Sequence, residues 1–259
     1  MAQPLAIQLE GRSLVVDAVP LTREAFAPFG DVVDNPRPQL HPSVAAANKE
    51  ALPYDGIVAN QGSAIKYQHI TRLVDLTSQA PSRRPGVAVA NMFVCAARTL
   101  LRPADAGGDI FPVRILERHP YTSQTFTPLT TNPDQRYLVI VAPSLPPSPA
   151  DRGFPVPATA PQGGRPLPGR GLPDTRHLRA FVATCEQAVT YAAGTWHSPM
   201  VALGPANTAI DFLVIQFANG VPIEDCQEVS LGLLKAGEDL PKQGAVLVRL
   251  PRRARDSRL

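Results

Sequence analysis

The strongest constraint on the fold is a long succession of short segments with the two-residue alternation of β-strands, separated by turn signals. This alternation places successive side chains on opposite faces of a sheet. Many short strands at close spacing are typical of a sandwich or a closed barrel, so we predict an all-β fold. The predicted strands are residues 14–16, 31–34, 63–70, 87–97, 110–117, 124–127, 136–142, 178–183, 187–191, 200–203 and 209–217.

Helical pattern is scarce by comparison. One short helix is predicted over residues 23–29, where Thr22 is a suitable N-cap and Gly30 a suitable stop. Residues 35–53 are rich in Pro, Asn and Ala, and we expect a loop there with one helical turn at most.

Residues 143–175 interrupt the strand pattern with ten prolines and five glycines in 33 residues. Proline removes backbone donors, and such a segment has little apolar surface to offset its ordering entropy. We interpret it as a surface loop inserted into a single domain over residues 1–250, and not as a domain boundary. A lid over a site and a dimer contact remain open as functions of this loop.

The charge of the chain is low and concentrated at its end. The net charge is +3, and residues 251–259 hold four arginines against one aspartate, which predicts a flexible basic tail. The body carries no basic cluster that would bind nucleic acid. The final Ser257-Arg258-Leu259 is similar to a peroxisomal import address, so a peroxisomal and a cytoplasmic location both stay open.

Other function classes are also disfavoured by the sequence. No apolar run approaches the length of a membrane span, so we expect no membrane partner. The three cysteines have no metal-ligand spacing and indicate a reducing compartment. We predict no organic cofactor.

Two segments carry the residues suited to chemistry. Glu117 and His119 are two positions apart on a predicted strand, so both point to one face, and Gln124 follows after a turn. In the second segment, Gly194 permits a tight turn and His197 begins the next strand. If that face lines a barrel interior, a carboxylate and two imidazoles converge there.

This pattern resembles the two motifs of the cupin superfamily. Glu117-x-His119 followed four residues later by Gln124 is similar to the first motif, with Glu117 in place of its first histidine. Ala192-x-Gly194-x-x-His197 is similar to the end of the second, with Ala192 in place of proline. The resemblance implies a cupin-type double-stranded β-barrel of jelly-roll type. Imidazole and carboxylate ligands suit Ni, Zn or Mn, so Glu117, His119, Gln124 and His197 are the candidate ligands of a divalent metal.

Longer blocks resemble the ureidoglycolate lyase family in the same order along the chain. They span about residues 20–231 and centre on Glu117-Arg118-His119-Pro120 and Trp196-His197-Ser198-Pro199. Further similar blocks are Pro20-Leu21-Thr22, Phe29-Gly30-Asp31-Val32-Val33, Asn60-Gln61-Gly62, Lys66-Tyr67 and Asp211-Phe212-Leu213. The proline-rich insertion and the basic tail depart from the compact form of the family.

The resemblance implies a carbon–nitrogen lyase that splits ureidoglycolate into glyoxylate and urea in allantoin breakdown, as a homodimer. It makes Glu117, His119, His197 and Lys66 the candidate catalytic residues. The candidate substrate-binding residues are Asn60, Tyr67, Gln124 and Trp196, although Trp196 is better suited to packing than to catalysis. The alternatives are a hydrolase that releases ammonia from the same substrate, a cupin that binds a small metabolite without turnover and, third, a sugar isomerase or dioxygenase.

Overall fold

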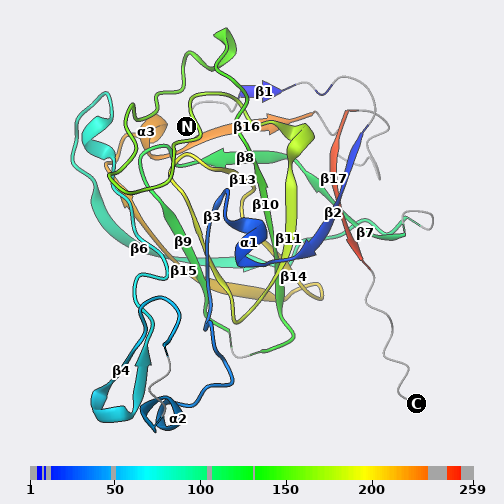
Figure 1. Cartoon of the computed structure of the whole chain (residues 1–259). Coiled ribbons are helices and arrows are strands. Elements are labelled where there is room, and N and C mark those ends of the chain that lie inside the picture. Colours follow the sequence, from blue (N-terminus) through cyan, green and yellow to red (C-terminus); the bar gives the residue numbers. More distant parts are fainter. Residues whose placement is uncertain are drawn as a thin grey trace.

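The structure is a computed structural model that describes residues 5–7, 9, 13–47, 51–103, 107–130, 132–232 and 244–251. The predicted basic tail from residue 252 onward, with its C-terminal tripeptide, lies outside these residues. Strands dominate the fold, which is a cupin-type β-barrel made of two curled sheets with three short helices in the described part of the chain (Figure 1). The helices are α1 (Arg23–Phe26), α2 (Pro42–Ala47) and α3 (Pro222–Asp225), and the single 3-10 turns are η1 (Asn60–Gly62), η2 (Thr77–Gln79), η3 (Pro149–Asp151) and η4 (Thr175–His177).

Over the described residues, the larger sheet has ten strands and the smaller has five. The larger sheet runs in the order β1 (Leu5–Ile7), β16 (Gln227–Leu231), β8 (Ile115–Arg118), β13 (Trp196–His197), β10 (Arg136–Ala142), β11 (Arg179–Thr184), β2 (Leu14–Pro20), β17 (Val246–Pro251) and β7 (Gly108–Val113), with β14 (Val201–Leu203) also paired to β10. The smaller sheet runs β3 (Gly30–Val33), β12 (Ala188–Tyr191), β9 (Gln124–Pro128), β15 (Ala209–Ala218) and β6 (Val87–Ala96). A separate hairpin joins β4 (Ile57–Ala59) to β5 (Ala64–Lys66).

Strand β10 divides two hydrophobic cores. Tyr137, Val139 and Val141 face the core between the two sheets, whereas Leu138 and Ile140 face a second core inside the curl of the larger sheet. Because both faces are covered, the strand is apolar throughout and does not alternate with polar residues. The core between the sheets is the barrel interior, and the candidate residues lie at one of its ends.

Gly30 fixes how closely the entry strand β3 approaches the barrel. Its Cα faces β12 so closely that a Cβ there would lie 1.9 Å from the carbonyl oxygen of Thr190. The short helix before it begins as predicted, since the Thr22 hydroxyl accepts a hydrogen bond from the amide of Ala25 at 3.2 Å. The α-helix itself ends at Phe26, earlier than the predicted span of 23–29.

One predicted strand is divided in the structure, and this corrects the predicted side-chain directions. The span 110–117 breaks at Arg114, whose carbonyl accepts a hydrogen bond from the amide of Leu231 at 2.8 Å. The chain there passes from β7, at one end of the larger sheet, to β8, near the other. Val113 and Leu116 consequently face the same core, so Glu117 does not share a face with Val113, as uninterrupted alternation over the predicted strand 110–117 would require.

The proline-rich insertion, residues 143–175, is attached to the barrel through a buried arginine. The guanidinium of Arg118 donates from Nε to Oε1 of Gln227 at 2.8 Å, from Nη1 to the carbonyl of Gly169 at 2.9 Å and from Nη2 to that of Arg170 at 2.9 Å. The arginine has no exposed surface. Contacts with Arg118, outside the segment, therefore hold in place a stretch whose own residues bury little apolar surface.

Candidate active site

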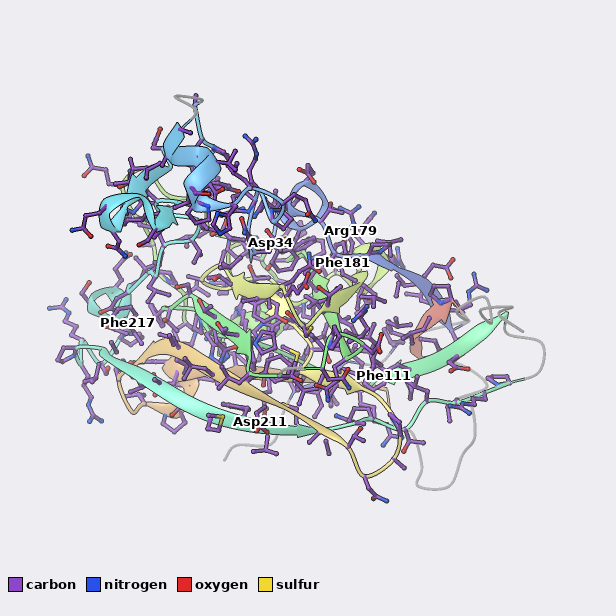
Figure 2. The ribbon with its side chains drawn as sticks, turned by 90° about the horizontal axis from the view of Figure 1, so that it is seen from below. Asp34, Phe111, Arg179, Phe181, Asp211 and Phe217 are labelled. Carbon is purple, nitrogen blue, oxygen red and sulfur yellow. The ribbon has the colours of Figure 1, made fainter. Side chains whose placement is uncertain are left out.

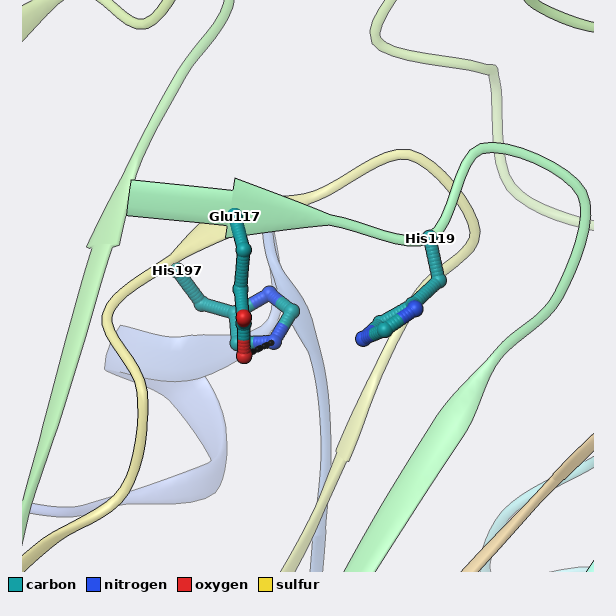
Figure 3. Close-up of side chains that lie close together, drawn as sticks. All are labelled: Glu117, His119 and His197. Atoms are coloured by element: carbon teal, nitrogen blue, oxygen red, sulfur yellow. Dashed lines mark ion pairs between the residues drawn. The ribbon is translucent and has the colours of Figure 1, made fainter. Parts of the chain in front are cut away.

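Two neighbouring strands bring the candidate residues together. Glu117 on β8 pairs directly with His197 on β13, and His119 follows just after β8 ends. Gly194, with a φ of 79°, makes the turn before β13, and its amide donates to the carbonyl of His119 at 2.8 Å. Figure 3 shows the three side chains converging on one point. The predicted shared face of Glu117 and His119 is therefore present in the structure.

Distances within this group, which we call the Glu–His cluster, permit a common ligand. Nε2 of His197 lies 3.7 Å from Oε1 of Glu117, and the two imidazole centroids are 5.5 Å apart. One potential ligand atom from each of Glu117, His119 and His197 lies within 4.8 Å of the others.

Hydrogen bonds to backbone carbonyls orient both imidazoles. Nδ1 of His119 lies 2.6 Å from the carbonyl oxygen of Asp225, and Nδ1 of His197 lies 2.9 Å from that of Thr195. A carbonyl only accepts, so each Nδ1 carries the proton and each Nε2 presents a lone pair. Both Nε2 atoms are buried without a hydrogen-bond partner in the structure. A histidine that donates through one nitrogen and offers the other is the usual arrangement of a metal ligand.

Gln124 adds a fourth buried acceptor. Its Nε2 donates to Oε1 of Gln216 on β15 at 2.5 Å, while its own Oε1 is buried without a partner. Gln216 lies directly opposite Gln124 in the sheet register. Two imidazole nitrogens, one carboxylate and one amide oxygen form a donor set that fits a divalent transition metal.

Burial sets the charge of the cluster. It raises the pKa of Glu117 to about 7, and the carboxylate of Glu228 acts in the same direction. Burial lowers the pKa of His197 to about 3, aided by the charge of His119, and it lowers the pKa of His119 against the opposing hydrogen bond to Asp225. At neutral pH both imidazoles are therefore neutral, while Glu117 exchanges its proton readily.

Sequence comparisons agree with this geometry. The model of the family described as ureidoglycolate lyase matches residues 13–234. The chain belongs to the ureidoglycolate lyase family. It is 32% identical over 220 residues to the ureidoglycolate lyase of Schizosaccharomyces pombe, which covers 85% of this chain and 92% of that protein. It is 29% identical over 224 residues to the ureidoglycolate lyase of Saccharomyces cerevisiae, a match that covers 83% of this chain and 93% of that protein. It is 31% identical over 196 residues to the ureidoglycolate lyase of Burkholderia mallei, which covers 76% of this chain and 78% of that protein.

Other predicted residues of this ureidoglycolate lyase family member lie away from the Glu–His cluster. Asn60, Lys66 and Tyr67 lie in or next to the β4–β5 hairpin, which stands at the opposite end of the molecule from β8 and β13 (Figure 1). Lys66 is exposed, and the buried hydroxyl of Tyr67 has no hydrogen-bond partner. The structure therefore does not bring the hairpin residues to the cluster of the same chain.

Trp196 is placed for packing and not for substrate contact. Successive strand residues face opposite sides, so its indole points away from the cluster that His197 faces. The side chain has no exposed surface, and Nε1 donates to the carbonyl of Gly171 at 3.0 Å. The guanidinium carbon of Arg118 lies 4.4 Å from the centroid of its ring system.

Sequence reasoning missed four residues that surround the Glu–His cluster. The ring of Tyr191 stacks on that of His197 with centroids 4.0 Å apart, and Glu228 pairs across the sheet with Glu117. The thiol of Cys226 lies 4.0 Å from Oε2 of Glu117, and burial raises its pKa to about 12, so it stays protonated. Gln216 is the fourth, and a glutamine within the apolar pattern of β15 was the one available signal for it.

Over the described residues, no helix is long and apolar enough to cross a membrane.

Proposed function

We propose that this protein is a ureidoglycolate lyase that eliminates urea from ureidoglycolate and yields glyoxylate, a step in allantoin breakdown. The observation that carries the proposal is the convergence of one carboxyl group of near-neutral pKa with two neutral imidazoles inside the barrel, in a member of this family. Such groups accept and donate protons at physiological pH.

The elimination moves a single proton. The reacting carbon of ureidoglycolate carries a hydroxyl, a carboxylate and the urea nitrogen. A base removes the hydroxyl proton as the C=O bond of glyoxylate forms and the C–N bond breaks, and the departing nitrogen takes up a proton to give urea. Glu117, with a pKa of about 7, is suited to receive the first proton and return it to nitrogen. His119 and His197 present acceptor atoms to the same point.

The same atoms fit a divalent transition metal, and the kinds of ligand atom suit Ni, Zn or Mn. Nε2 of His119, Nε2 of His197, the carboxylate of Glu117 and Oε1 of Gln124 would hold it. When bound, such an ion supplies Lewis acidity that polarises the hydroxyl and carboxylate oxygens of the substrate. Glu117 is then committed as a ligand, and another side chain must carry the proton. Lys66 and Tyr67 are the candidates from the sequence.

The test of the activity is urea release from racemic ureidoglycolate by the purified protein, with ammonia followed in parallel. We expect urea above the spontaneous rate and no ammonia, because C–N elimination leaves urea intact. Ammonia would instead indicate the hydrolase, and binding without turnover would indicate a metabolite-binding cupin.

Chelation tests the metal separately. We expect dialysis against a chelator to remove a stoichiometric metal, measured by elemental analysis, and to reduce urea release until Ni, Zn or Mn is returned. A matched sample of the His119→Ala variant should retain less metal after the same purification. Full activity in metal-free protein would exclude the metal and leave Glu117 as the proton carrier.

We also infer that two copies associate through β6. The outer edge of this strand pairs with no other strand in the described part of the chain, and it exposes Val87, Met92 and Val94 by 63%, 58% and 69%. A long apolar edge strand that stays uncovered promotes aggregation, so a partner is expected to cover it. Light scattering should give a dimer, and Val94→Glu should shift it toward the monomer, whereas exposed Leu129→Glu should not.

A further inference from the structure

The family block around Lys66 stands apart from the barrel that holds the Glu–His cluster. We call α2 and residues 51–67 the arm. Its helix and strands pack mainly on one another, and both views show them standing off the sheets (Figures 1 and 2). Its surface exposes Val44 by 46% and Ile57 by 48%. Exposed apolar residues on a projecting element indicate a surface that is covered in the assembled protein.

The tip of the arm is held in a strained conformation. Asn60 and Gln61 are consecutive non-glycine residues with φ values of 49° and 52°, in the left-handed region. L-residues rarely adopt this conformation, and strain of this kind concentrates at functional sites. Lys66 ends β5 on the same small hairpin and is exposed.

The Glu–His cluster lacks the charge that the arm carries. The proposed substrate is a carboxylate, which a cationic side chain would bind, whereas the charged residue that pairs with Glu117 across the sheet is the acidic Glu228. The nearby guanidinium of Arg118 points to the other face of β8, where the insertion engages it. The arm offers one such cation, the exposed ammonium of Lys66.

The inner face of β6, which carries Val89 and Phe93, leads to the cluster, while Met92 and Val94 lie on the outer face of the same free edge strand. On the inner face of the smaller sheet, Val89 pairs with Gln216, and Gln216 pairs with Gln124 beside the cluster. Phe93, further along that face, is 44% exposed although its ring contacts Phe126 of the barrel interior. An element that docks on this side of β6 therefore lies next to the cluster.

We propose that, in the dimer, the arm of each subunit docks at β6 of the other and places Lys66 beside the partner's Glu117, where its ammonium binds the substrate carboxylate. This inference rests on the proposed lyase function. It predicts that neither subunit has a complete active site alone.

Purified heterodimers test it directly. Two differently tagged chains are co-expressed, and the mixed dimer is isolated by tandem affinity purification. In the first dimer one chain carries Lys66→Ala and the other His197→Ala; we expect about half the urea-releasing activity of the wild-type dimer, since one site combines an intact cluster with an intact arm. In the second dimer one chain is wild type and the other carries both substitutions; we expect background activity, because each site then has one defect.

The reverse pattern would place Lys66 in the site of its own chain and overturn the inference. Half of the wild-type activity in both mixed dimers would show that Lys66 is not needed. We expect the Lys66→Ala homodimer to lose about 10- to 100-fold in kcat/KM, and wild-type activity in that homodimer would likewise show that Lys66 is not needed. A monomeric, fully active wild-type protein would also overturn it. An inactive wild-type dimer would instead remove the proposed function. Circular dichroism and the dimer mass of each variant exclude unfolding as the cause.

Discussion

The two faces of β8 differ in whether their buried polar groups have hydrogen-bond partners. On one face, the donors of Arg118 reach Gln227 and the carbonyls of Gly169 and Arg170, and its guanidinium lies over Trp196. On the other face, Glu117 and His119 join His197 around a point where both imidazole Nε2 atoms lack partners. A buried polar group without a partner costs about 1–3 kcal/mol. The satisfied face therefore stabilises the fold, whereas the unsatisfied face is available to a ligand.

The largest effect should come from the unsatisfied face and fall mainly on activity. We expect His197→Ala to reduce kcat/KM by about 10²- to 10⁴-fold, as removal of a proton-transfer or ligand group does. Its free energy of unfolding should fall by less than that of Arg118→Ala, because the losses are the Nδ1 hydrogen bond to Thr195 and the ring contact with Tyr191, while Nε2 has no partner to lose. Steady-state urea release and urea denaturation measure the two quantities. A large loss of stability would contradict the assignment of this face to function.

Arg118→Ala should give the opposite result. Its truncation leaves Gln227 and the carbonyls of the insertion without donors, so we expect the free energy of unfolding to fall by about 3–5 kcal/mol. Arg118→Lys should recover only part of the lost stability, because an ammonium lacks the planar set of donors that a guanidinium presents. The exposed Arg114→Ala on the adjoining turn is the control and should cost little. Increased proteolysis within 143–175 would locate the damage.

Glu117→Gln should stabilise the metal-free protein at high pH. The folded pKa of about 7 exceeds the ordinary 4.5, so the native state binds more protons than the unfolded state between these values. The wild type therefore loses stability as pH rises from about 4.5 to 7. We expect the variant to gain about 2–3 kcal/mol at pH 8 and almost nothing at pH 4. Parallel stability curves for the two proteins would disprove the raised pKa.

Trp196→Phe should have the smallest effect. It removes the hydrogen bond from Nε1 to Gly171 but keeps an aromatic ring beside Arg118, so we expect a loss of about 1 kcal/mol in stability. KM for ureidoglycolate should not change, because the indole faces away from the cluster. A raised KM would return Trp196 to the substrate-binding residues.

Local sequence pattern was sufficient for most strands and for the pairing of the two motifs. Glu117 and His119 were predicted to share a face because alternation is a local property, and Gly194 marked the turn that positions His197. Strands β1, β16 and β17 were not predicted, because β1 and β16 are short and β17 has apolar residues on both faces and so does not alternate. The break at Arg114 depends on distant pairing with Leu231, which no local window contains.

The proline-rich insertion and the β4–β5 hairpin also show contacts that local sequence pattern does not predict. Composition predicted a surface loop for residues 143–175, but side chains outside the segment, Arg118 and Trp196 among them, donate to its carbonyls and hold its end. The resemblance placed Lys66 in the active site, yet the fold of one chain leaves it apart from Glu117. Which segments meet in space is decided by tertiary and quaternary contacts, and sequence spacing does not encode them.

The pairing of the first and last strands has a consequence for biosynthesis. Strand β2 lies in parallel between β11 and β17, with Leu14 opposite Val246, and β1 pairs with β16 through Leu5 and Val229. At about 5–20 residues per second, the ribosome needs more than ten seconds to make the chain between β2 and β17. Strand β2 has no native neighbour until β11 is made, and its other edge stays exposed until β17 follows. The nascent protein is thus expected to depend on chaperones until its last strand emerges and closes the larger sheet.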